Sequence, residues 1–125
     1  DVGKALSPET CEGQQYGGAY MAAGRVMGEE VIYDPKTGVK LNANLVDYKV
    51  ATFRDIEETE NILVETGMGY GPYGLVGIGE DCATVVPFVV ANAIHNAIGE
   101  WVDDHPATPD KVIQAIKKAK EKGVY

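Results

Sequence analysis

Cysteine is scarce in this sequence, which has two in 125 residues. Cys11 and Cys82 lie far apart, and no Cys-x-x-Cys pair occurs. A disulfide framework and a four-thiolate zinc or iron–sulfur site both need more thiolates than this chain holds. We therefore expect free thiols and a reducing, cytoplasmic setting.

Basic residues are also few: the sequence has 11 Lys and Arg and 19 Asp and Glu, so its net charge is −8. An acidic chain is a poor partner for phosphate backbones and anionic lipids, so neither nucleic acid nor a membrane is an expected partner. Long apolar runs are missing, as is a basic segment before a short apolar one, which argues against a membrane span and a signal peptide. We expect one domain over residues 1–125 or, because the chain begins at Asp1 without Met, a processed product or a piece of a longer protein.

Glycine, by contrast, is abundant, with 15 residues gathered mainly at 13–28 and 67–79. Ser7, Pro8 and an acidic residue after them predict the start of a helix that runs towards Glu30. Each glycine inside that helix costs about 1 kcal/mol relative to Ala, so we expect a close contact that offsets the loss. A backbone or a flat ligand can lie directly on the glycine-striped face, which comprises Gln14, Gly17, Gly18, Met21, Gly24 and Gly28.

The remaining elements predict an α+β fold. Residues 31–33, 39–50 and 61–66 have the composition of short mixed or antiparallel strands, and residues 34–38 have that of a turn. Two more helices follow. Residues 83–98 are apolar on nearly every side and stop at Gly99, which predicts the most buried helix, whereas Thr108-Pro109-Asp110 opens an amphipathic C-terminal helix that stops at Gly123.

The glycine-rich loop formally contains Gly-x-Gly-x-x-Gly at residues 69–74, the fingerprint of a dinucleotide site. That fingerprint needs a helix to begin at the loop, whereas residues 75–79 prolong it, so a nucleotide site is disfavoured. Glu80 lies between this loop and the apolar helix. Desolvation there would raise its pKa towards that of a general base, but a solvated acid facing the helix dipole is the more ordinary interpretation.

Other reactive side chains are isolated. His95 and His105 have no metal-ligand spacing around them and are expected to be structural. Cys82 either faces the same pocket as Glu80 or is a small buried thiol. The tyrosines either frame a binding surface or serve as half-buried packing; those closest to the glycine clusters are Tyr16, Tyr20, Tyr70 and Tyr73.

Several motifs in order along the chain resemble one family. They are Asp1-Val2-Gly3, Gly13-Gln14-Gln15-Tyr16-Gly17-Gly18, Glu29-Glu30, Asn44-Leu45-Val46-Asp47-Tyr48-Lys49, Gly71-Pro72-Tyr73-Gly74, Gly77-Ile78-Gly79-Glu80 and Thr108-Pro109-Asp110. The sequence is similar to the C-terminal segment of the large, molybdenum-cofactor-binding subunit of the xanthine dehydrogenase and aldehyde oxidoreductase family. The resemblance implies that the chain is part of a larger molybdopterin-binding domain.

The resemblance also implies roles for residues of both glycine clusters. Glu80 takes the place of the active-site base, and Gln14 that of the amide which contacts the pyranopterin. Gly17, Gly18, Gly77 and Gly79 would let the backbone approach this molybdenum–pyranopterin cofactor. The implied reaction is oxidative hydroxylation of an aldehyde or N-heterocycle, with water as the oxygen source.

Implied partners are the rest of the molybdopterin-binding chain and the domains or subunits that carry [2Fe–2S] clusters and FAD, which this chain cannot house. Met21, Ala22, Asp81 and Cys82 depart from the family's usual residues near the cofactor, so the substrate and the occurrence of hydroxylation stay open. A non-catalytic cofactor-binding or assembly module with the same fold is the alternative. A base requires a perturbed carboxylate at Glu80, and a scaffold does not.

Overall fold

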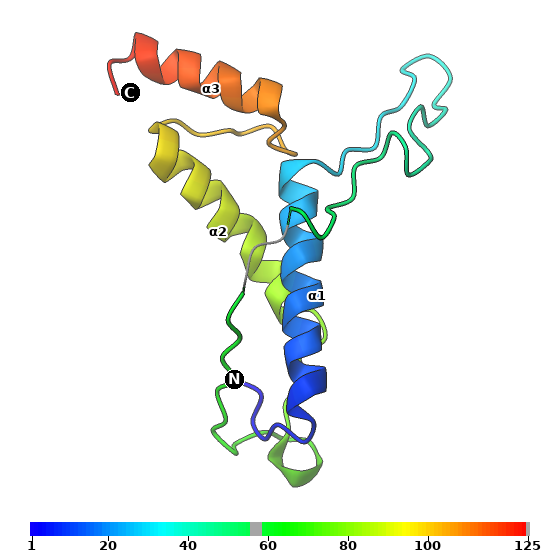
Figure 1. The fold of residues 1–125 in the computed structure, drawn as a ribbon, viewed down its shortest axis with the longest axis vertical. Helices are drawn as coiled ribbons and strands as arrows, with labels where there is room; N and C mark the ends of the chain where they lie inside the picture. Colours follow the sequence, from blue (N-terminus) through cyan, green and yellow to red (C-terminus); the bar gives the residue numbers. More distant parts are fainter. Residues whose placement is uncertain (56–58, 125) are drawn as a thin grey trace.

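The structure is a computed structural model that describes residues 1–55 and 59–124. Its described elements are the α-helices α1 (Pro8–Met27), α2 (Asp81–Ile98) and α3 (Pro109–Glu121) and the short 3-10 helix η1 (Pro72–Gly74). α1 and α2 cross, α3 lies near the C-terminal end of α2, and the chain after α1 forms a projecting arm (Figure 1). The glycine-rich loop with η1 lies at the opposite end, beside the start of α1 (Figure 1).

The helix positions predicted from capping residues are confirmed. α1 starts at Pro8 after the N-cap Ser7, although the Ser7 hydroxyl bonds Thr10 Oγ1 at 2.8 Å rather than a backbone amide. α2 stops at Gly99, whose φ of 71° lies in the left-handed region that glycine favours. α3 starts after Thr108, whose hydroxyl donates to Asp110 Oδ1 at 2.6 Å. α1 ends at Met27, one turn short of the predicted Glu30.

The predicted strands are wrong. The described residues contain no strand, and the arm has a single isolated antiparallel bridge between Tyr33 and Lys40. Its two sides are joined by hydrogen bonds from the Asp34 amide to Val39 O and from the Leu41 amide to Ile32 O, each 2.8 Å long. Two paired extended segments are only marginally stable unless a third strand or a helix packs against them. The described residues supply neither.

The first residues of the chain tie the glycine-rich loop to the start of α1. The Val2 amide donates to Val64 O at 2.9 Å, and the Val76 amide donates to Val2 O at 3.0 Å. Gly3 follows with a φ of 63°, and a Cβ there would come within 2.1 Å of Gly74 O. Glycine is therefore required at position 3 both for its backbone conformation and for the close approach of the loop.

The prediction that the apolar helix is the most buried one is also wrong. Ile98 is the one residue of α2 that is buried, whereas α1 buries Gly18, Ala22, Gly24 and Val26. The reason is that α1 covers one side of α2, α3 touches it little, and no other described element covers the rest. α2 also has the length and mean hydropathy of a membrane-crossing helix, although no membrane span was expected from the sequence. The core helix of a water-soluble protein can have the same length and hydropathy.

Candidate functional site

A cleft of about 680 Å³ lies between α1 and the start of α2. One wall is the part of the glycine-striped face of α1 from Gln14 to Met21, without Gly24 and Gly28, and the other is the end of the glycine-rich loop with the first turns of α2. The residues that line it are Gly13, Gln14, Gly17, Gly18, Met21, Arg25, Gly79, Glu80, Ala83, Thr84 and Pro87. The cleft thus joins two parts of the chain that are about sixty residues apart, as their numbering shows.

The α1 wall is bare because of glycine. A Cβ at Gly13 or at Gly17 would meet nothing within 4 Å, so the backbone of α1 is open to the cleft at these positions. Gly18 has a different task, because its Cβ would lie 3.2 Å from both the Ala83 nitrogen and Cys82 Cβ. Gly18 lets α2 approach α1, whereas Gly17 leaves room for a ligand.

The opposite wall is the N-terminus of α2. Glu80 occupies the N-cap position, and its carbonyl oxygen accepts hydrogen bonds from the amide and the hydroxyl of Thr84, both at 3.1 Å. No side chain caps this end, so the first amides of α2 and the positive end of its dipole lie beside the cleft. The Glu80 side chain is exposed in these 125 residues. Its expected desolvation therefore requires further protein or a ligand over the cleft.

The structure brings together most of the site residues predicted from the sequence. Gln14, Gly17, Gly18, Gly79 and Glu80 all line the cleft. Gly77 does not, and a Cβ there would meet nothing within 4 Å.

The Gly-x-Gly-x-x-Gly segment forms η1, and α2 begins only after the further loop 75–80. The geometry of a dinucleotide fingerprint, with a helix opening directly from the loop, is therefore missing, as predicted.

Arg25 and Thr84 are two cleft residues that the sequence analysis missed. Arg25 lies four residues after Met21, so the helical spacing that defined the glycine-striped face could have extended to it. Thr84 lies one turn after Glu80, and only the observed start of α2 places it beside the cleft. Arg25 is the one cationic side chain in this lining.

The remaining reactive side chains lie outside the lining of the cleft. His95 stacks on Trp101 with ring centroids 4.0 Å apart, and half-buried Cys82 lies against Gly18. Tyr16 stacks on Tyr20, and the hydroxyls of both bond to Thr59, whereas Tyr70 and Tyr73 are largely exposed. Within residues 1–55 and 59–124, no group of three His, Cys, Asp or Glu side chains could hold a metal ion.

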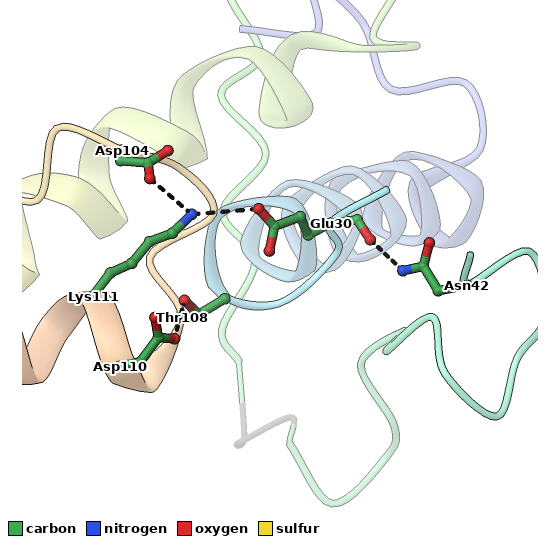
Figure 2. Close-up of polar contacts among 6 residues, drawn as sticks. All are labelled: Glu30, Asn42, Asp104, Thr108, Asp110 and Lys111. Carbon is green, nitrogen blue, oxygen red and sulfur yellow. Dashed lines mark hydrogen bonds and ion pairs between the residues drawn. The ribbon is translucent and has the colours of Figure 1, made fainter. Parts of the chain in front are cut away.

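A polar network fastens the end of α1 to the start of α3 (Figure 2). Lys111 Nζ lies 3.3 Å from Asp104 Oδ2 and 3.5 Å from Glu30 Oε1. Partial burial opposes the charge of Lys111, but its contacts with the two carboxylates outweigh this effect and raise its pKa. Beside them the buried Asn42 donates from Nδ2 to Glu30 O at 2.6 Å and accepts from the Ile32 amide at 2.9 Å.

The same two ends are joined through the backbone. The Ala107 amide, just before α3, donates to Val26 O in the last turn of α1 at 2.6 Å. The end of α1 is therefore held by both main-chain and side-chain contacts to residues 104–111. These contacts fix the direction of the helix whose glycine face forms the cleft.

The cleft fits a flat group that carries an anion. Open backbone at Gly13 and Gly17 admits a flat ring system, and the Gln14 amide can donate and accept hydrogen bonds beside it. The uncapped amides of α2 favour a negatively charged substituent. These features are those expected of one wall of a cofactor site, and the cleft is open rather than closed.

Comparison with known proteins agrees with this class of site. Residues 1–57 match the molybdopterin cofactor-binding domain family. The chain is 36% identical over 119 residues to the xanthine dehydrogenase molybdenum-binding subunit of Escherichia coli O157:H7, covering 95% of this chain and 16% of that protein. It is 32% identical over 116 residues to the aldehyde oxidoreductase molybdenum-binding subunit PaoC of Escherichia coli K12, covering 92% of this chain and 16% of that protein.

A solved structure shows the same arrangement. Quinoline 2-oxidoreductase from Pseudomonas putida 86 matches with a TM-score of 0.82 and 29% identity, covering 94% of this chain and 15% of that one. The chain belongs to the xanthine dehydrogenase and aldehyde oxidoreductase family, in which it is similar to part of the molybdenum-binding subunit. It spans about one sixth of the length of these relatives.

Proposed function

We propose that this chain forms one wall of the cofactor and substrate site of a cytoplasmic molybdenum hydroxylase. The observation that supports the proposal most directly is the shared cleft, in which the glycine-striped face of α1 lies opposite Glu80 at the N-terminus of α2. The molybdenum–pyranopterin cofactor, when bound, supplies the two-electron oxidation. The chain's own residues hold that cofactor and move a proton.

Each proposed role follows from the chemistry of the side chain. Gln14 hydrogen-bonds the rim of the pterin, and Gly17 and Gly79, which line the cleft, keep the backbone free of side chains where the cofactor approaches. Gly18 lets α2 approach α1 beside them, and Gly77 lies outside the cleft lining. Glu80 accepts a proton as the oxygen of water is transferred to an electron-poor carbon of an aldehyde or N-heterocycle. [2Fe–2S] clusters and FAD on partner domains or subunits would carry the electrons away, since this chain holds no group for that chemistry.

The proposal is tested at Glu80 in the assembled enzyme. Glu80→Gln keeps the size and hydrogen-bonding reach of the side chain but removes its basicity. We expect full cofactor content and a chemical step slower by about 10²- to 10⁴-fold, the range for loss of a general base. The measurement is single-turnover reduction of the molybdenum centre by substrate across pH.

Asp81→Asn is the matched control, because Asp81 is the neighbouring carboxylate and lies outside the cleft lining. It should leave the reduction rate close to that of the wild type. A fully loaded Glu80→Gln enzyme with a near-normal rate would remove Glu80 from the mechanism. The chain would then be a non-catalytic cofactor-binding or assembly module, the second candidate, which the exposure of Glu80 to solvent favours.

A further inference from the structure

Two hydrogen bonds from Thr84 hold the backbone of Glu80. The Thr84 amide donates to Glu80 O at 3.1 Å, and the Thr84 hydroxyl donates to the same oxygen, also at 3.1 Å. Thr84 lies one turn after Glu80, so the two residues are on the same side of the first turn of α2, and both line the cleft. The residue proposed as the base therefore lies beside the residue that holds it.

The position of the hydroxyl bond at the end of a helix gives it weight. In a helix interior, a Thr hydroxyl often bonds the carbonyl four residues before it, which the backbone ladder already holds. Glu80 is instead the N-cap residue, and no side chain caps this end of α2. Within residues 1–55 and 59–124, Glu80 has no hydrogen bond besides the two from Thr84. The hydroxyl thus supplies one of the two hydrogen bonds that fix Glu80.

The chain before Glu80 supports it little. Gly77 and Gly79 flank Ile78, and a Cβ at either glycine would meet nothing within 4 Å. Glycine has the greatest backbone freedom of any residue, so this segment can change direction easily. The Glu80 backbone, with φ −129° and ψ 3°, also differs from the extended conformation usual at an N-cap. Its position is therefore set from the C-terminal side, where Thr84 lies.

The direction of the hydroxyl bond preserves the basicity of the carboxylate. A carbonyl oxygen can only accept, so the Thr84 proton is donated to Glu80 O and is not available to the Glu80 carboxylate. A hydrogen bond donated to a carboxylate favours its charged form and weakens it as a base. The Thr84 hydroxyl can therefore orient Glu80 without making it a poorer proton acceptor.

We propose that Thr84 is a positioning residue for the reaction, whose hydroxyl holds the backbone of Glu80 and so keeps the carboxylate directed into the cleft. The proposal rests on the proposed function, because it takes Glu80 as the group that accepts the proton. A general base must lie within hydrogen-bonding reach of the proton that it removes. A displacement of about 1 Å can slow a reaction by about 10²-fold, so a bond to one backbone oxygen is enough to affect the rate.

The first test compares Thr84→Val with Thr84→Ser in the assembled, cofactor-loaded enzyme. Val replaces the hydroxyl with a methyl group and has a similar helix propensity, whereas Ser keeps the hydroxyl. The substrate is whichever of benzaldehyde and xanthine the wild type oxidises. We expect single-turnover reduction of the molybdenum centre to be about 10- to 10²-fold slower in Thr84→Val, with the substrate Kd and the pH profile unchanged, and to recover in Thr84→Ser.

Three results of this test would overturn the proposal. A normal rate in Thr84→Val would show that the hydroxyl is not needed. A changed substrate Kd would mean that Thr84 contacts the substrate itself. A lower Tm with an unchanged rate per loaded molybdenum centre would make Thr84 a residue of stability alone.

A double-mutant cycle shows whether Thr84 acts through Glu80. In a Glu80→Gln background the base is already lost, so adding Thr84→Val should slow the reaction by less than about twofold. The same loss in both backgrounds would show that Thr84 acts elsewhere and would contradict the proposal.

Amide hydrogen exchange tests the attachment of Glu80 without reference to activity. The amide of residue 84 donates to Glu80 O, and we expect it to exchange about two- to tenfold faster in Thr84→Val than in Thr84→Ser, after correction for intrinsic rates. Equal exchange would refute the attachment. A normal rate in Glu80→Gln, with exchange still faster in Thr84→Val, would refute the catalytic role of Glu80 and leave the attachment intact. A slow Glu80→Gln enzyme with a normal Thr84→Val enzyme would refute only the role of Thr84.

Discussion

Gly18 of α1 lies so close to Ala83 of α2 that a Cβ at Gly18 would stand 3.2 Å from the Ala83 backbone nitrogen. This contact brings the N-terminus of α2, and with it Glu80, up to the glycine-striped face. One turn of α1 therefore has two adjacent glycines with different purposes. Gly18 sets the distance between the helices, and Gly17 keeps the cleft open.

Gly18→Val should destabilise the fold. A branched side chain at this point must push α2 away from α1, which costs about 1–3 kcal/mol of unfolding free energy, as overpacking usually does. Gly17→Val is the control, because the same side chain there meets open space and improves helix propensity. Urea unfolding of the two variants measures the difference, and equal stabilities would show that the helices do not depend on Gly18.

Gln14→Ala should weaken cofactor retention in the assembled enzyme. Loss of the amide would leave polar atoms of a bound pterin unpaired, at about 1–3 kcal/mol. Gly17→Leu should have a larger effect, because it fills the cleft. Molybdenum and pterin content after gel filtration gives the result. Full content in both variants would mean that the glycine-striped face contacts protein instead.

Lys111→Met should loosen α3. The substitution keeps the length of the side chain but removes its ion pairs with Glu30 and Asp104. We expect faster amide hydrogen exchange across α3 than in the wild type, and Lys111→Arg should restore protection. Added salt screens the partly exposed charges of these ion pairs. It should therefore reduce the difference in amide exchange rate between the wild type and Lys111→Met. Equal exchange in the three proteins would assign the attachment of α3 to the backbone bond between Ala107 and Val26.

Glu65→Gln should make stability less dependent on pH. A hydrogen bond from the Ala5 amide, reinforced by Lys4, holds the pKa of Glu65 below its ordinary value of 4.5. A carboxylate with a depressed pKa stabilises the fold above its unfolded pKa, and this contribution is lost as pH falls through the folded pKa. The wild type should therefore have a higher Tm than Glu65→Gln near pH 7, and the two Tm values should be about equal near pH 3. Thermal unfolding between these pH values measures the difference. An advantage that does not change with pH would contradict the argument.

The helices could be predicted from the sequence because local signals determine their ends. Pro8, Gly99 and Pro109 act within one turn of the chain, and the structure has helix ends at each of them. The strands could not be predicted, because a strand needs a neighbour at the correct distance. Residues 31–33 and 39–50 have strand composition, but the described residues offer the arm only a single bridge.

The cleft was foreseeable in part. Helical spacing predicted that Gln14 and Gly17 share one face, which forms one wall of the cleft. The position of Glu80 between the glycine-rich loop and the apolar helix indicated the other wall. That the two walls face each other depends on the crossing of α1 and α2, which no local pattern specifies. The burial of α2 was mispredicted for the same reason, since hydrophobicity shows that a surface needs a partner and not where that partner lies.

The backbone contacts at the two ends of α1 can form only after later parts of the chain have been synthesised. Near its start, the chain bonds to Val64 and Val76, and near its end, Val26 accepts a bond from Ala107. Because a ribosome releases a chain from the N-terminal side, α1 emerges before residues 64, 76 and 107, to which the backbone at its two ends is bonded. The glycine-striped helix is thus without these long-range contacts until those residues have been synthesised. Folding of this region is expected to be slow and late, as for other chains held together by contacts distant in sequence.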